Sequence, residues 1–228
     1  MSKTSALAAV LMLAAIPALA QQTYELPKTV PAIRTNVTRH GHFYVGGSFV
    51  GDEAKRQMIG QMYVEMWAPA KITHKYPLVF FHGFGGTGTT WMQSADGRKG
   101  WADYFVDQGF AVYIVDGPAR GRSLYNAERQ PKQVVGNTAD SMRTVTNPRD
   151  SGDWPQAKLH TQYPGTGKYG DPIFEAAFSR GVASIADNDE QQRLVQHAAS
   201  ALLDRIGPAI VVTHSQAGPF GWLIADAR

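Results

Sequence analysis

The sequence predicts an α/β protein built on a mostly parallel sheet. Three apolar runs, residues 76–81, 110–116 and 209–213, are continuous rather than alternating, which is typical of strands buried on both faces. Helix-like segments at 100–109 and 188–206 lie between them, and strands that alternate with helices indicate a parallel sheet. The chain has 228 residues, of which 43% are hydrophobic and 18% charged, so we expect one domain with one sizeable core.

The N-terminal segment is typical of an export signal. Residues 1–20 contain a single charge, Lys3, an apolar run from Ala6 to Ile16, and small residues before Ala20. This run is shorter than the roughly 20 apolar residues that cross a bilayer, which favours a cleaved signal peptide over a membrane anchor. We expect cleavage after Ala20, export to the periplasm or the extracellular space, and no stable membrane insertion of the mature chain.

Composition excludes several classes of function. Without Lys3 the mature chain has 21 basic and 19 acidic side chains, a net charge of +2, and no stripe of Lys and Arg with interleaved aromatics, so we expect no nucleic-acid partner. The absence of cysteine excludes disulfides, thiolate nucleophiles and cysteine-based metal sites. We expect no metal and no organic cofactor, and the oligomeric state stays open.

Two strands are expected before the first buried run. The segments HFYVGGSFVG at 42–51 and GQMYVEMW at 60–67 have the pattern of antiparallel partners. The alternation in the second places Met62, Val64 and Met66 on one face.

Capping residues mark the ends of two helices. The segment 100–109 ends at a glycine, Gly109. Asp187 and Asn188 are N-cap candidates for a helix that runs to residue 206, where Gly207 and a proline end it.

Residues 124–186 show no clear periodicity and are rich in proline, glycine, asparagine and aromatics. The segment is too long for an ordinary connection, and we interpret it as an insertion that caps a site; a disordered stretch is the alternative. Its aromatic residues could line an apolar pocket or form a small core of the cap itself: Trp154, Tyr163, Tyr169 and Phe174.

The loop after the first buried run fits two phosphate-binding patterns. Gly83, Gly85 and Gly88 match G-x-G-x-x-G, and the same glycines have P-loop spacing with Thr89 in the place of the lysine. Asp116 ends the next strand, where a ribose-binding acid would lie. A histidine precedes the glycines, however, and the loop does not lead directly into an amphipathic helix. A dinucleotide-dependent oxidoreductase is therefore kept only as an alternative.

A second motif favours different chemistry. The residues THSQAG at 213–218 follow the last buried strand, and a nucleophile elbow of the G-x-S-x-G kind needs small residues two before and two after its serine. Thr213 and Ala217 are small, although neither is glycine. Ser215 would then be a nucleophile, whereas the simpler alternative is that it caps the following helix.

An elbow of this kind needs a partner loop. In an acyl-transfer enzyme with this layout, one backbone N–H comes from a loop after an earlier strand and another from the residue after the serine. The glycine-rich loop would supply the first, so we expect the N–H groups of Phe84 and Gln216 to form an oxyanion hole.

The segments FFHGFGGTGTTW, VDGPARGRS and THSQAG have the order and spacing of the α/β-hydrolase superfamily. From about His40 to Arg228 the chain resembles secreted bacterial serine esterases with Ser-Gln after the elbow histidine. The resemblance implies an α/β-hydrolase fold with Ser215 as nucleophile and the backbone amides of Phe84 and Gln216 as oxyanion donors.

The resemblance also assigns supporting residues. Asp116, Arg120, Gly121 and Ser123 match a D…RGRS turn that is mainly structural in the superfamily.

The histidines are expected to lie outside the chemistry. His82 and His214, with the adjacent Gly83, are expected to support the site by packing beside it. His160 and His197 are expected to be ordinary surface histidines.

In this superfamily the triad follows in the order serine, acid, histidine. After Ser215 the sequence contains Asp226 but no histidine. The similar esterases are expected to use a glutamate after the next strand and a histidine near the end of the chain. We therefore expect both partners beyond Arg228, and we interpret residues 21–228 as the N-terminal part of an incomplete α/β-hydrolase domain with an apolar edge open at 209–213.

The function expected for the intact protein is an exported serine hydrolase that acts on small-molecule carboxylic esters through an acyl-enzyme on Ser215. A noncatalytic binding module with the same fold, which needs neither acid nor histidine, is the alternative from another class.

Residues 21–228 expressed alone should be poorly soluble and should show little turnover, because the triad acid and histidine and the flanking strands are expected elsewhere. Thermal unfolding and hydrolysis of a p-nitrophenyl ester test this. Cooperative melting together with enzyme-like turnover would contradict the expectation.

Overall fold

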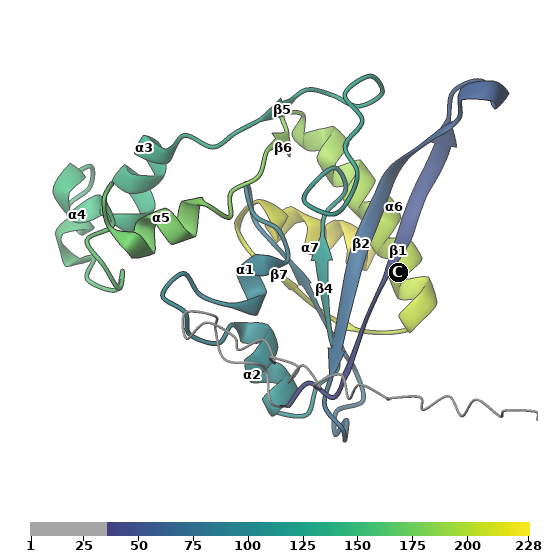
Figure 1. Ribbon diagram of the computed structural model, residues 1–228, viewed down its shortest axis with the longest axis horizontal. Helices are drawn as coiled ribbons and strands as arrows, with labels where there is room; N and C mark the ends of the chain where they lie inside the picture. Colours follow the sequence, from purple (N-terminus) through teal and green to yellow (C-terminus); the bar gives the residue numbers. More distant parts are fainter. Residues whose placement is uncertain (1–35) are drawn as a thin grey trace, which may run out of the picture. The chain divides into compact units, whose positions relative to one another are not determined.

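The computed structural model describes residues 36–228, and the signal segment expected at 1–20 lies outside them. The described residues are organised around a mixed sheet (Figure 1). Its strand order is β1-β2-β4-β3-β7, in which β1 and β2 are antiparallel and β3 pairs in parallel with both β4 and β7. The strands span β1 Arg39–Val50, β2 Gln57–Ala68, β3 Leu78–Phe81, β4 Val112–Asp116 and β7 Ile210–Thr213.

The register of the parallel strands aligns their carboxyl ends. Phe80 pairs with Ile114 of β4 and with Val212 of β7, and Phe81 pairs with Thr213. The loops that follow β3, β4 and β7 therefore leave the sheet at one edge, where ligands bind in open α/β sheets.

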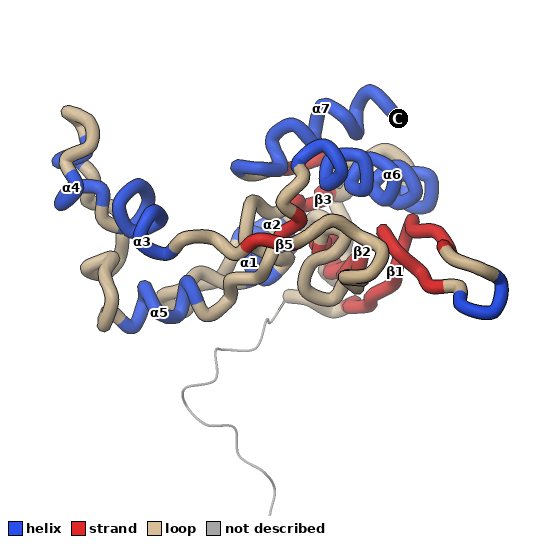
Figure 2. Tube along the Cα trace, turned by 90° about the horizontal axis from the view of Figure 1, so that it is seen from above, coloured by secondary structure: helices blue, strands red, loops and turns tan. Residues whose placement is uncertain are grey.

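Helices cover both faces of the sheet (Figure 2). One face carries α1 (Thr89–Met92) and α2 (Trp101–Asp107), and the other carries α6 (Asn188–Ile206) and α7 (Gly218–Ala227). The helix expected at 188–206 is confirmed: the Asp187 carboxylate accepts hydrogen bonds from the next turn, and Gly207, at φ 81°, ends it.

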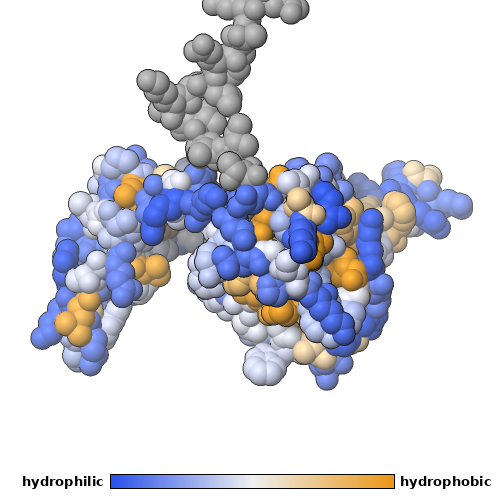
Figure 3. Space-filling model, turned by 90° about the horizontal axis from the view of Figure 1, so that it is seen from below, coloured by the Kyte–Doolittle hydropathy of each residue, from blue (hydrophilic) through white to orange (hydrophobic). Residues whose placement is uncertain are grey.

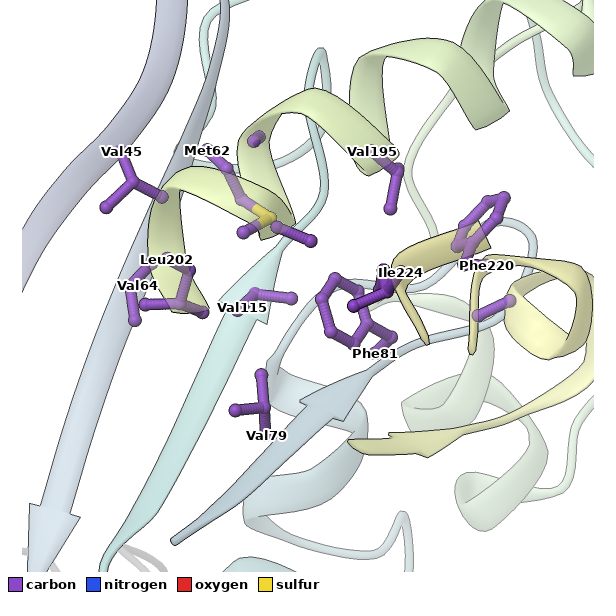
Figure 4. Close-up of a cluster of buried hydrophobic side chains, with 13 residues drawn as sticks. Val45, Met62, Val64, Val79, Phe81, Val115, Val195, Leu202, Phe220 and Ile224 are labelled. Carbon is purple, nitrogen blue, oxygen red and sulfur yellow. The ribbon is translucent and has the colours of Figure 1, made fainter. Parts of the chain in front are cut away.

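The two faces bury alternate residues of the same strands. Val79 and Phe81 pack with α6 and α7 (Figure 4), whereas Leu78 and Phe80 pack with Trp91 and α2. A strand that contributes to two cores has no polar face. The apolar runs at 76–81 and 110–116 are therefore confirmed as strands buried on both sides, whereas the run at 209–213 forms β7, an edge strand that is only partly buried.

The segment 124–186 consists of short elements. They are β5 Gln133–Val134, α3 Thr138–Ser141, the π-helical turn η2 Met142–Thr146, α4 Pro148–Ser151, the 3-10 turn η3 Ala157–Leu159, α5 Pro172–Phe178 and β6 Ser184–Ile185, with β5 and β6 paired antiparallel. Phe174 is 1% exposed, and its ring lies 5.4 Å from that of Tyr169 and 4.5 Å from that of Phe178. Phe174 thus belongs to a small core of this segment itself.

Apolar side chains remain exposed where the sheet ends at β7. Ile210 is 46% exposed, and Trp222 on α7 is 81% exposed. Figure 3 shows apolar patches among hydrophilic residues on one face of the molecule.

Within residues 36–228, no helix combines the length and the apolar character that crossing a bilayer requires.

The packing of α6 on β1 gives a stability prediction. Gly46, at φ 64°, lies so close to α6 that an added Cβ would sit 2.7 Å from the Ala198 Cα, whereas a Cβ at Gly41 would meet nothing within 4 Å. Gly46→Ala should lower the free energy of unfolding by about 1–3 kcal/mol through backbone strain and overpacking. Gly41→Ala on the same strand should change it by less than about 0.5 kcal/mol. Equal effects in urea unfolding would show that the close approach is unimportant.

Candidate active site

Ser215 lies in a strained turn between β7 and α7. A short 3-10 turn, η4 (Ser215–Ala217), connects the two, and Ser215 has φ 57°, in the left-handed region. Non-glycine residues rarely adopt this conformation, and it is a feature of the strand-to-helix nucleophile elbow. The N-cap of α7 is Ala217, and Ser215 forms no side-chain cap, so the capping alternative is wrong.

Small residues surround this turn for steric reasons. Ala217 is completely buried in the core beneath α6 and α7. A Cβ added at Gly221 would lie 3.4 Å from the Thr213 methyl group. Larger side chains at these positions would push α7 away from β7.

The glycine-rich loop after β3 meets the Ser215 turn. A Cβ at Gly83 would lie 2.9 Å from the Ser215 Cβ and 3.1 Å from His214 Nδ1, so only glycine fits. The loop then forms a tight turn in which the Gly86 N–H donates to the Gly83 carbonyl at 3.2 Å. Gly85, at φ 67°, takes the position that requires positive φ in a type II turn.

Arg120 connects the glycine-rich loop to the Ser215 turn. It is 3% exposed, and its Nη1 donates to the Gly83 carbonyl at 2.9 Å while its Nη2 donates to Gln216 Oε1 at 2.5 Å. The Gln216 amide in turn donates to Asn188 Oδ1 at 3.1 Å, at the start of α6. The Gln216 side chain is therefore held at both ends.

His82 stabilises the glycine-rich loop through both ring nitrogens. Nε2 accepts from the Gly117 N–H at 2.9 Å, which leaves Nδ1 as the protonated nitrogen that donates to the Gly83 carbonyl at 3.0 Å. Burial, with a contribution from the Arg120 charge, lowers the pKa of His82 to about 4. The ring is neutral at pH 7, with neither nitrogen free.

Comparisons with known proteins agree with this geometry. No family model matches the sequence. The chain is similar to a probable secreted lipase, phiG, of Fungal sp. (strain ATCC 74256), with 45% identity over 189 residues that cover 82% of this chain and 48% of the relative. It thus spans about half the length of that curated relative. A solved bacterial esterase superposes with a TM-score of 0.66 at 25% identity, over 88% of this chain and 67% of that chain. The described residues have the α/β-hydrolase fold.

The turn after β4 is organised around Asp116. Its Oδ1 accepts from the Gly88 N–H at 2.8 Å, and its Oδ2 accepts from Arg122 Nε at 2.8 Å. Burial alone would raise the pKa of Asp116, but the hydrogen bonds from Arg122 and Gly88 outweigh it and hold the pKa below its usual range. Both carboxylate oxygens are engaged, so the dinucleotide alternative finds no free acid here.

The same turn explains two further residues of the RGRS motif. The Ser123 hydroxyl donates to the Asp116 carbonyl at 2.7 Å and accepts from the Tyr63 N–H at 2.8 Å. A Cβ at Gly121 would lie 2.6 Å from Asp116 Oδ2. These contacts are structural, whereas Arg120 in the same motif reaches the two loops instead. Its position in the sequence gave no sign of those partners.

Of the other histidines, His214 lies beside Ser215 and Gly83, whereas His160 and His197 lie elsewhere. His214 is exposed, and its ring meets that of Trp91 edge-on at a centroid distance of 6.3 Å. His160 borders a small polar cavity within the segment 124–186, and His197 is exposed on α6.

A cavity of about 350 Å³ lies between the glycine-rich loop and the segment 124–186. Two hydrogen bonds link its walls: the Val182 N–H donates to the Gly85 carbonyl at 2.9 Å, and the Gly85 N–H donates to Ser184 Oγ at 3.2 Å. The lining is largely apolar and includes Phe84, Val135, Ala177 and Phe178. Of the four aromatics singled out in the sequence, none lines it. No cluster of metal-ligating side chains occurs among residues 36–228.

The buried state of His82 predicts a pH dependence of stability. Unfolded histidine takes up a proton near pH 6.5, whereas folded His82 does so near pH 4, so the unfolded state binds more protons between these values. Stability should therefore fall as pH decreases from 6.5 to 4, with about 3 kcal/mol attributable to His82.

His82→Gln removes this contribution and leaves the carboxylates in place. Urea unfolding at several pH values should show a weaker pH dependence for the variant than for the wild type. Parallel curves for the two proteins would refute the assignment of a neutral, buried His82.

Proposed function

We propose that the intact protein is an exported serine hydrolase that cleaves carboxylic esters through an acyl-enzyme on Ser215. One observation carries the proposal: the left-handed Ser215 turn and the Gly83 loop meet at the carboxyl edge of the sheet. The lipase and esterase named among the similar proteins support the same chemistry. The word "secreted" in the lipase name supports export.

The oxyanion donors are the backbone N–H groups of Phe84 and Gln216. Phe84 occupies the second position of the turn closed by the Gly86–Gly83 hydrogen bond, which leaves its own N–H outside that bond. Gln216 lies in the first turn of a helical segment, where N–H groups have no intrahelical partner. Removal of one such donor typically costs about 10²- to 10³-fold in kcat.

The reaction takes two balanced steps. The Ser215 oxygen attacks the ester carbonyl, its proton passes to a general base, and the alcohol leaves after taking that proton. Water then attacks the acyl-enzyme, which releases the acid and restores the serine hydroxyl. His82 is not this base because both its ring nitrogens are engaged. The resemblance implies that the base is a histidine and that its partner is a glutamate.

The cavity beside Phe84 is the substrate pocket in this proposal. Its apolar walls fit a hydrophobic part of an ester, and the segment 124–186 acts as a cap inserted in a hydrolase domain that begins at residue 21. Acyl transfer by a serine requires no metal or organic cofactor.

Ser215→Ala in the complete gene product should abolish ester hydrolysis and labelling by a fluorophosphonate, because only an activated serine reacts readily. Ser48→Ala, an exposed serine on β1, is the matched control and should retain both. Retained turnover in Ser215→Ala would refute the nucleophile. A wild-type protein that neither turns over esters nor becomes labelled would favour the noncatalytic binding module.

A further inference from the structure

Arg120 is a buried cation without a carboxylate partner among the described residues. The nearby acids are engaged by another arginine: Arg122 forms ion pairs with Asp116 at 2.8 Å and with Glu65 at 2.5 Å. Arg120 instead contacts the Gly83 carbonyl and the Gln216 amide oxygen, and its Nε has no hydrogen-bond partner. Buried charges are normally paired, so this arrangement is costly and calls for an explanation.

The backbone beside Arg120 is strained as well. Within residues 36–228, Ala119 and Ser215 are the non-glycine residues with positive φ, at 60° and 57°. The Ala119 carbonyl accepts from Gln133 Nε2 at 2.7 Å, which holds this conformation. Strain of this kind clusters at functional sites, and here it occurs immediately before Arg120.

The Gly83 carbonyl and the Phe84 N–H belong to one planar peptide unit. That carbonyl accepts hydrogen bonds from three donors: Arg120 Nη1 at 2.9 Å, His82 Nδ1 at 3.0 Å and the Gly86 N–H at 3.2 Å. Together these donors fix the plane of the peptide, and the charged Arg120 polarises it most, which makes the Phe84 N–H a stronger donor. The hydrogen bonds to the Gly83 carbonyl thus fix the direction of the Phe84 N–H at the other end of the same peptide unit.

Gln216 is held in a comparable way. Its side chain lies between Arg120 and Asn188, so the backbone that carries the second donor N–H cannot turn freely. One guanidinium therefore fixes both halves of the oxyanion hole, although Gly83 and Gln216 come from different loops.

We propose that Arg120 is a positioning residue that aims the Phe84 and Gln216 N–H groups at one oxyanion and adds the positive potential of an unpaired buried cation. The inference rests on the proposed esterase function. Burial lowers the pKa of Arg120 to about 10, so the side chain remains charged at neutral pH. A purely structural arginine would hold the loops together without this effect on the transition state.

The test compares Arg120→Gln and Arg120→Lys with the wild type in the complete gene product, with kcat normalised by fluorophosphonate titration of active sites. Arg120→Gln should lower kcat by about 10- to 100-fold, because it weakens donors worth about 10²- to 10³-fold each. KM should change little, since the effect is confined to the transition state. Arg120→Lys, which keeps the charge but not the fork of donors, should recover part of the loss.

A second readout separates positioning from folding. An alkylboronic acid forms a tetrahedral adduct with the serine, so its inhibition constant should rise by the same factor as kcat falls. Arg122→Gln is the matched control: it should lower the melting temperature through loss of the Asp116 and Glu65 contacts and leave kcat per titrated site unchanged.

Three results would overturn the inference: wild-type kcat per titrated site in Arg120→Gln, a boronate constant that does not follow kcat, or equal kcat losses in Arg120→Gln and Arg122→Gln. If Arg120→Gln does not fold, kcat per titrated site and the boronate inhibition constant of Arg120→Lys are used instead. Wild-type values of both in Arg120→Lys would then refute the proposal. Turnover retained by Ser215→Ala would instead refute the esterase mechanism. Loss in Ser215→Ala with unchanged Arg120 variants refutes only the role of Arg120.

Discussion

The close approach of Gly83 to Ser215 is the constraint on which the rest of the site depends. It follows from the parallel register in which Phe81 of β3 pairs with Thr213 of β7, because two aligned strands release their loops at the same level. A side chain at position 83 would fill the contact, and the pairing of β3 with β7 would then have to shift. The glycines of this loop, which in sequence fit phosphate-binding patterns, have separate steric reasons: Ser215 lies against Gly83, Gly85 has a positive φ, and Ile114 and Asp116 lie against Gly88.

The charged residues near this contact differ in whether they are paired. Asp116, Glu65 and Arg122 form ion pairs, whereas Arg120 has no carboxylate partner among residues 36–228. Asp116 and Glu65 share Arg122, and the hydrogen bonds that they accept hold the pKa of each below its usual range although burial opposes this. His82 stays neutral because burial lowers its pKa. Arg120 is thus not needed to pair these carboxylates. Its guanidinium instead donates hydrogen bonds to the two loops that carry the proposed oxyanion donors.

The sequence predicted the features that are set locally. The apolar runs at 76–81 and 110–116 identified strands buried on both faces, Asp187 identified the start of α6, and the residues around Ser215 identified the turn after β7, because each depends on neighbours within a few positions. The run at 209–213 identified a strand, β7, but this strand lies at the sheet edge and is only partly buried. The role of Arg120 could not be predicted in this way. Its partners lie 37 and 96 residues away, and the motif that contains it gave no reason to separate it from Arg122. Short elements in the segment 124–186 left no periodicity to detect.

Strain at the site must be stabilised by the structure around it. A non-glycine residue in the left-handed region costs roughly 1–3 kcal/mol, and both Ser215 and Ala119 adopt it. For Ser215 the compensation comes from β7, which pairs with β3, and from α7, whose Phe220 and Ile224 are buried in the core. For Ala119 it comes from hydrogen bonds that Gln133 and Gln191 donate to the carbonyls of the loop. Because Gln133 belongs to the segment 124–186, that segment supports the conformation of the Arg120 loop as well as the wall of the cavity, which couples the proposed substrate pocket to the proposed oxyanion hole.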